Sequence, residues 1–148
     1  MLIRIKNKIS DNADGIRKKL KSKFNGRFDI RCHHYALKIK QGIEGNSYRY
    51  ALRIFNKYIL PNKFLLKIRE AKKGDIIAYY SDEYQETIHW AILVKPAKRL
   101  KDFIVRSKWG TLEVYEHNIF KCVYDTATHI AIIPKNKIKI FIENQPQT

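Results

Sequence analysis

The sequence predicts an α+β fold in which helices come first and pack on a mostly antiparallel β-sheet. Apolar residues recur with helical spacing in the first 60 residues, whereas from residue 75 onward short β-branched and aromatic runs are separated by turn residues. With 148 residues, 45% of them hydrophobic, the chain can bury a core without disulfides or metals. No repeat or linker indicates a division, so we expect one domain spanning residues 1–148.

Three helices are expected before the sheet. The basic segment 1–28 is predicted to contain a short helix near residues 16–20, preceded by side chains that can cap it. Asp29 can cap a second helix, and Gly42 can end it. A third helix restarts after Asn46 and Ser47. Its apolar stripe consists of Tyr48, Ala51, Leu52, Phe55 and Ile59, with Pro61 just beyond its end.

Short apolar runs predict the strands of the sheet. The polar loop 81–86 separates the first two, Gly110 interrupts the chain after the third, and Pro134 separates the last two. The expected strands are residues 75–80, 89–94, 102–108, 112–115, 128–133 and 137–142.

Charge is the most unusual bulk property of the chain, which has 30 Lys and Arg residues against 14 Asp and Glu and a formal net charge of +16. Such a surplus attracts polyanions, namely nucleic acid, anionic lipid or acidic wall polymers. The same lysines are equally compatible with a solvated surface that has no dedicated partner. The basic residues are spread along the chain, and no nucleic-acid-binding motif is present.

The two cysteines, Cys32 and Cys122, are too few for a disulfide framework, so we expect a reducing compartment. No apolar run reaches the length of a membrane span, and the first residues lack the long apolar core of a signal peptide. We therefore expect a protein that is cytoplasmic as synthesised or exported without a cleavable signal. The sequence predicts no cofactor.

Cys32 is the main candidate for chemistry. On the second helix Cys32, Tyr35, Ala36 and Ile39 fall on one face, near the helix N-terminus, whose partial positive charge favours a thiolate. His89 opens a predicted strand beside a polar loop and could serve as the base. By alternation His89 and Ala91 share a face, and the small Ala91 leaves room for a helix end.

At these residues the chain resembles the NlpC-type branch of the papain-like cysteine hydrolases. In that branch a cysteine begins a helix, Gly-Asp and apolar residues open a strand, and His-x-Gly/Ala opens the next strand. The resemblance covers about residues 30–110 in the right order, and it implies a papain-like fold and acyl hydrolysis by a Cys–His dyad. The matching residues are Cys32, Gly74-Asp75-Ile76-Ile77 and His89-Trp90-Ala91-Ile92.

The family usually orients its histidine with a polar residue on the following strand, often His, Asn, Gln or Glu. Here that strand carries Ser107, which could accept from the imidazole as a weaker substitute, whereas Arg106 or Lys108 would repel an imidazolium. A backbone carbonyl or a water could also fill this role. We therefore take Cys32, His89 and Ser107 as the candidate catalytic set.

The resemblance also implies an oxyanion hole at the backbone N–H of Cys32, completed by the side chain of His33 or His34. Lys108 and Trp109 offer a charge and a flat apolar wall for substrate, and with His33 they form the candidate substrate-binding set. The positive surface would hold an anionic, peptide or cell-wall type of substrate.

Other interpretations remain open. A helical cysteine is often a small buried hydrophobe, and Cys122 is interpreted as core; Trp90 and Trp109 are interpreted as core or pocket wall. His117, His129 and the two cysteines are metal-type ligands, but none has the close spacing of a structural zinc site, so we predict no metal.

A second hypothesis is a nucleic-acid-binding module or metal-independent RNase, in which His33, His34, His89 and Lys108 surround a phosphate and tyrosines stack bases. A third is an inactive papain-like domain that only binds a partner.

Overall fold

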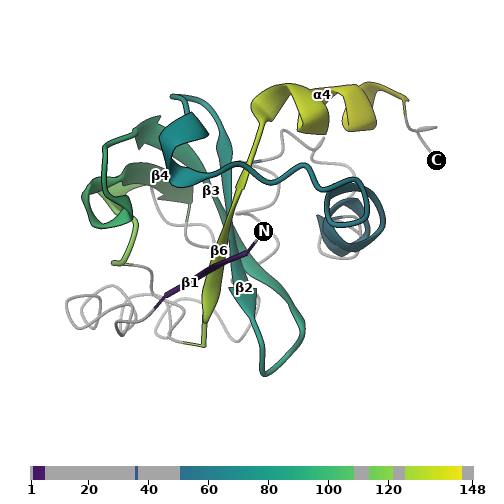
Figure 1. Ribbon diagram of the computed structural model, residues 1–148, viewed down its shortest axis with the longest axis horizontal. Coiled ribbons are helices and arrows are strands. Elements are labelled where there is room, and N and C mark those ends of the chain that lie inside the picture. The colour runs from purple at the N-terminus through teal and green to yellow at the C-terminus, as the bar shows by residue number, and fades with distance from the viewer. Residues whose placement is uncertain (1, 6–35, 37–50, 109–113, 122–125, 145–148) are drawn as a thin grey trace.

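A computed structural model describes residues 2–5, 36, 51–108, 114–121 and 126–144, and the fold is built on a six-stranded sheet (Figure 1). The strand order is β1-β6-β2-β3-β4-β5, and every neighbouring pair is antiparallel. The strands are β1 (Ile3–Arg4), β2 (Ile76–Ser81), β3 (Glu86–Lys95), β4 (Ile104–Lys108), β5 (Val114–Asn118) and β6 (His129–Ile133). The predicted α+β class with a mostly antiparallel sheet is thus confirmed.

The centre of the sheet is the β2–β3 hairpin. Tyr79 lies opposite His89, and the register shifts by one residue beyond this pair, so that Tyr80 lies opposite Thr87. Such a β-bulge bends the strand and strengthens its local twist. Both strands were expected, and both run longer toward their shared turn than the sequence predicted.

The helical segments of the described part are short. Residues 51–53 are helical and continue into a π-helix, η2 (Ile54–Ile59), in which the N–H of Leu60 donates to the Phe55 carbonyl at 3.0 Å. Two single turns of 3₁₀-helix follow, η3 (Ile68–Glu70) and η4 (Leu100–Asp102). The C-terminal helix is α4 (Lys135–Asn144). The predicted third helix is confirmed over its described residues, and its members Ala51, Phe55 and Ile59 are buried.

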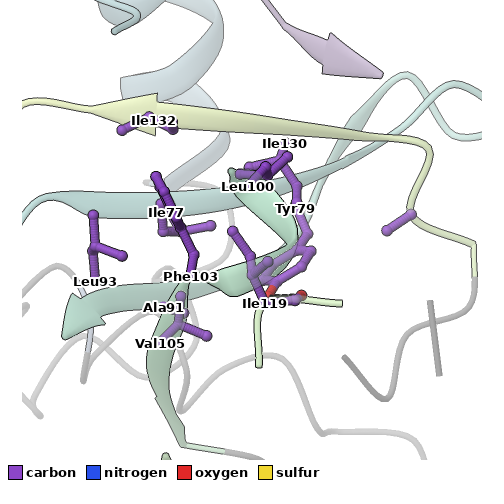
Figure 2. Close-up of a cluster of buried hydrophobic side chains, with 11 residues drawn as sticks. Ile77, Tyr79, Ala91, Leu93, Leu100, Phe103, Val105, Ile119, Ile130 and Ile132 are labelled. Atoms are coloured by element: carbon purple, nitrogen blue, oxygen red, sulfur yellow. Dashed lines mark hydrogen bonds between the residues drawn. The ribbon is translucent and has the colours of Figure 1, made fainter. Parts of the chain in front are cut away.

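Two hydrophobic clusters cover the two faces of the sheet, because successive strand residues point to opposite sides. The first cluster centres on Ile77, Tyr79 and Ala91, and Figure 2 shows the Tyr79 ring reaching toward Ile119, whose carbonyl accepts from the Tyr79 hydroxyl at 2.7 Å. The second cluster fills the face that carries Trp90. It contains Ala36, Ala51, Ile54, Phe55, Ile59, Ile76, Ala78, Trp90, Ala131, Ile133 and Ile138.

The prediction of a last strand at residues 137–142 is wrong, since these residues belong to α4 (Figure 1). The alternation of Lys and Ile there is typical of a strand, but β6 is already hydrogen-bonded to β1 on one side and to β2 on the other. β6 therefore has no free edge with which a further strand could pair. Pro134 precedes the helix, where its fixed φ and missing N–H cost nothing.

One strand was not predicted, and the bounds of two others differ from the prediction. β1 was not foreseen in the basic segment 1–28, because a strand of two residues carries no periodic signal. The strand predicted at 102–108 begins only at Ile104, after the turn η4, and the strand predicted at 112–115 extends to Asn118. The predicted helices at residues 16–20 and 30–42 lie outside the described residues, except that Ala36 is helical and buried.

Candidate functional site

His89 does not open its strand as predicted, because β3 begins three residues earlier at Glu86; its side chain is fully buried at the centre of the sheet. It is opposite Tyr79 in the ladder, and the two rings lie 5.5 Å apart between centroids at an angle of 39°. Tyr79 and Ala91 both belong to the first cluster, so the His89 imidazole lies on that face of the sheet. The predicted sharing of a face by His89 and Ala91 is confirmed.

Ser107 lies on the same face, on the next strand. The β3–β4 register pairs Ile92 with Arg106 and Leu93 with Val105, which places Ser107 opposite Ala91. Its side chain is fully buried, and its hydroxyl is 2.8 Å from Nε2 of His117 on β5. Ser107 thus lies on the strand next to that of His89 but opposite Ala91, and its described hydrogen bond is to His117.

The second ring nitrogen of His117 defines the direction of that bond. Nδ1 lies 2.8 Å from the carbonyl of Asn118, which can only accept, so Nδ1 carries the hydrogen and Nε2 accepts from the Ser107 hydroxyl. Burial lowers the pKa of His117 to about 4; the Asn118 carbonyl opposes this shift, and the positive charge of Lys121 adds to it. The His117 imidazole is thus neutral at neutral pH.

His117 was considered from sequence only as a possible metal ligand. Its pairing with Ser107 depends on β5 reaching Asn118 and on the register that puts Val105 opposite His117. A strand predicted to end at Tyr115 could not show this contact. The polar residues His89, Ser107 and His117 thus occupy three successive strands on one face of the sheet.

The Gly-Asp pair that opens β2 has a clear structural role. Gly74 adopts φ +95°, and its N–H donates to the Leu93 carbonyl at 2.8 Å, which ties the start of β2 to β3. Asp75 accepts from the N–H of Lys72 at 2.8 Å and from the N–H of Lys135 at 3.2 Å. One carboxylate thereby joins the loop before β2 to the first residue of α4.

Cys32 and His33 lie outside the described residues, as do Trp109 and Cys122. Lys108 is the last residue of β4, and its side chain is likewise not described. Their predicted roles stay predictions.

Ala36, four positions after Cys32 in the sequence, is described by the structure. It is 2% exposed and belongs to the second cluster, on the face of Trp90 rather than that of His89. Trp90 is fully buried there and packs edge-to-face on Phe55 with ring centroids 6.1 Å apart. The interpretation of Trp90 as a core residue is confirmed.

Within the described ranges no group of three or more His, Cys, Asp or Glu side chains is arranged to hold a metal ion. None of the helices in that part of the chain is both long enough and apolar enough to cross a bilayer.

Fold and site together define an α+β protein with a buried histidine on the central strand of an antiparallel sheet. No protein-family model, no curated protein and no solved structure matches this chain.

Proposed function

We propose that the protein is a thiol hydrolase of papain-like, NlpC-related type, in which Cys32 attacks an amide or ester carbonyl. His89 takes the thiol proton and returns it to the leaving group, and water then hydrolyses the thioester. The observation that carries this proposal is the fully buried imidazole of His89 on the central strand, beside the strand that Gly74-Asp75 opens.

Burial of an imidazole in an apolar cluster costs free energy, because the ring loses hydration that a hydrocarbon side chain never had. An aliphatic residue at position 89 would pack against Tyr79 and the cluster around Ala91 without that cost. We therefore propose the buried His89, rather than its apolar neighbours on this face, as the base.

Ser107 supports the assignment of a third residue. Its hydroxyl donates its hydrogen to Nε2 of His117, so the lone pairs of the hydroxyl oxygen are left to accept a hydrogen bond. In the proposed arrangement Ser107, from the strand next to that of His89, would accept from the imidazole nitrogen that carries the hydrogen.

The proposal places a definite requirement on Cys32. In a helix that contains both residues, Cys32 precedes Ala36 by about one turn, or roughly 6 Å. Because Ala36 packs on the Trp90 face, Cys32 must reach His89 around the end of the sheet rather than across the face that carries Ala36.

The proposed substrate is anionic, of the peptide or cell-wall type, in keeping with the formal net charge of +16. The Cys32 N–H is assigned to the oxyanion hole, and His33, Lys108 and Trp109 to substrate contact.

The test is the pH dependence of Cys32 alkylation by iodoacetamide in a Cys122→Ser background. In this background the protein is expected to react rapidly well below pH ~8.5, near which an ordinary thiol ionises. His89→Gln, which keeps a polar side chain of similar length, should remove the reactivity at low pH. His129→Gln is the matched control, since it removes an imidazole from β6 and should leave the profile unchanged.

Slow alkylation of Cys32 in a folded protein with His89 intact would contradict the proposal and favour an inactive binding domain. Circular dichroism of His89→Gln separates loss of the dyad from loss of the fold. An activated thiolate that is lost in His89→Gln would then direct trials to peptide, amide and ester substrates.

A further inference from the structure

A cavity of about 800 Å³ lies between the loop that precedes β2 and the start of α4. Four lysines line it, Lys72 and Lys73 from the loop and Lys135 and Lys139 from the helix. Leu66 and Pro134 form its apolar part. The cavity shares no residue with the candidate catalytic set.

The two lysine-bearing segments are held in place by one side chain. Asp75, only 8% exposed, accepts from the N–H of Lys72 through one oxygen and from the N–H of Lys135 through the other. The opposite wall is tied to the sheet where the N–H of Leu66 donates to the Ile132 carbonyl at 2.8 Å. The lysines therefore project from a backbone that the fold has fixed.

The charge of this cavity is not neutralised within the described part of the chain. Its lining includes two carboxylates, Glu70 and Asp75, against the four lysines, which leaves two positive charges in excess. Glu70 accepts from the N–H of Lys67 at 2.9 Å, so both carboxylates are engaged by backbone donors. No ion pair joins a lining lysine to an acid among the residues that the structure describes.

The lining also indicates which anion would fit. Ammonium groups act as point charges toward phosphate oxygens, whereas planar recognition of a carboxylate favours arginine. The described lining contains neither an arginine nor an aromatic ring on which a nucleobase could stack. A cavity of about 800 Å³ is also in the range that holds a whole small molecule rather than a single ion.

We propose that this cavity binds a compact multiphosphate anion, of the pyrophosphate or tripolyphosphate type. The phosphate oxygens would lie between Lys72 and Lys73 on one side and Lys135 and Lys139 on the other. The affinity is expected to fall as salt rises, since the lysines are exposed to solvent.

The test is calorimetric titration of the full chain with sodium tripolyphosphate at low and at physiological salt. Lys72→Gln/Lys135→Gln removes one cation from each side of the cavity, and Lys57→Gln/Lys98→Gln removes the same net charge from exposed sites outside it. Binding with one site per chain is expected. The cavity variant should bind tripolyphosphate at least about tenfold more weakly, because it loses two lysine–phosphate contacts. A tenfold loss of affinity corresponds to ~1.4 kcal/mol, which is modest for two such contacts. The control variant should stay within about twofold of the unsubstituted protein.

Equal weakening in both double variants would overturn the proposal, since attraction would then come from net charge alone. So would the absence of saturable tripolyphosphate binding. Orthophosphate, titrated in parallel, should bind more weakly than tripolyphosphate; equal affinity would mean a single-phosphate site and would contradict the multiphosphate assignment. Displacement of tripolyphosphate by a short RNA duplex at lower concentration would favour a nucleic-acid backbone instead.

Discussion

Ser107 and His117 form a hydrogen bond of 2.8 Å between the strands β4 and β5, on the face of the sheet that also carries His89. The bond is directed, because the Asn118 carbonyl fixes the hydrogen of His117 on Nδ1. Two polar side chains thereby satisfy each other on a face whose other buried residues, apart from His89, are mainly apolar.

His117 should make stability depend on pH. Its pKa is about 4 in the folded protein against an ordinary value of 6.5, so below pH 6.5 the unfolded chain binds more protons than the folded one. The stabilising effect is complete above pH ~6.5 and is lost as the pH falls toward ~4, amounting to at most about 3 kcal/mol. Urea unfolding between pH 4 and pH 7.5 measures it. His117→Gln should lack this part of the slope, and a variant slope equal to the wild-type slope would contradict the assignment.

Asp75 should stabilise the protein through its two backbone contacts. Asp75→Ala leaves the N–H groups of Lys72 and Lys135 without their acceptor, and we expect a loss of ~2–3 kcal/mol in the free energy of unfolding. Chemical denaturation measures the loss. Asp102→Ala removes an exposed carboxylate and should change stability by less than ~0.5 kcal/mol. A similar effect of both substitutions would argue against the joining role of Asp75.

Gly74 occupies a backbone conformation that side chains disfavour. A Cβ at this position would meet only the Cδ of Lys135 at 3.6 Å, which is an ordinary contact, so the penalty of Gly74→Ala comes from φ +95° alone. We expect a loss of ~1–2 kcal/mol in thermal or urea unfolding. Gly74→Asn should cost less, because asparagine adopts positive φ more readily than alanine. Equal unfolding free energies for the alanine and asparagine variants would contradict the expected penalty of the positive φ at this position.

Phe55 should connect the helical segment to the sheet. Its fully buried ring contacts Trp90 at 6.1 Å and Tyr80 at 6.0 Å between centroids. Phe55→Ala is expected to cost ~3–5 kcal/mol by leaving a cavity on this face. Tyr84→Ala, which truncates a ring that is 56% exposed, should cost less than ~1 kcal/mol. The comparison is made by equilibrium unfolding, and a small effect at Phe55 would mean that the segment adds little to the core.

The elements whose signals are local can be predicted from the amino-acid sequence. The apolar runs of β2, β3 and β6 alternate or are β-branched, and the turn residues between them are visible without knowledge of the fold. The shared face of His89 and Ala91 follows from the two-residue period of a strand alone. The stripe of Ala51, Phe55 and Ile59 is equally local, and these residues are helical and buried.

The elements and contacts that depend on distant residues could be established only from the three-dimensional fold. The segment after Pro134 has a strand pattern, yet it forms α4 because β6 is paired on both edges and Asp75 binds the first N–H of the helix. The partnership of Ser107 with His117 required the register of β4 and β5, which adjacent residues do not encode. The lysine-lined cavity likewise brings positions 72 and 135 together, because one buried carboxylate between them satisfies two backbone donors that would otherwise lack an acceptor.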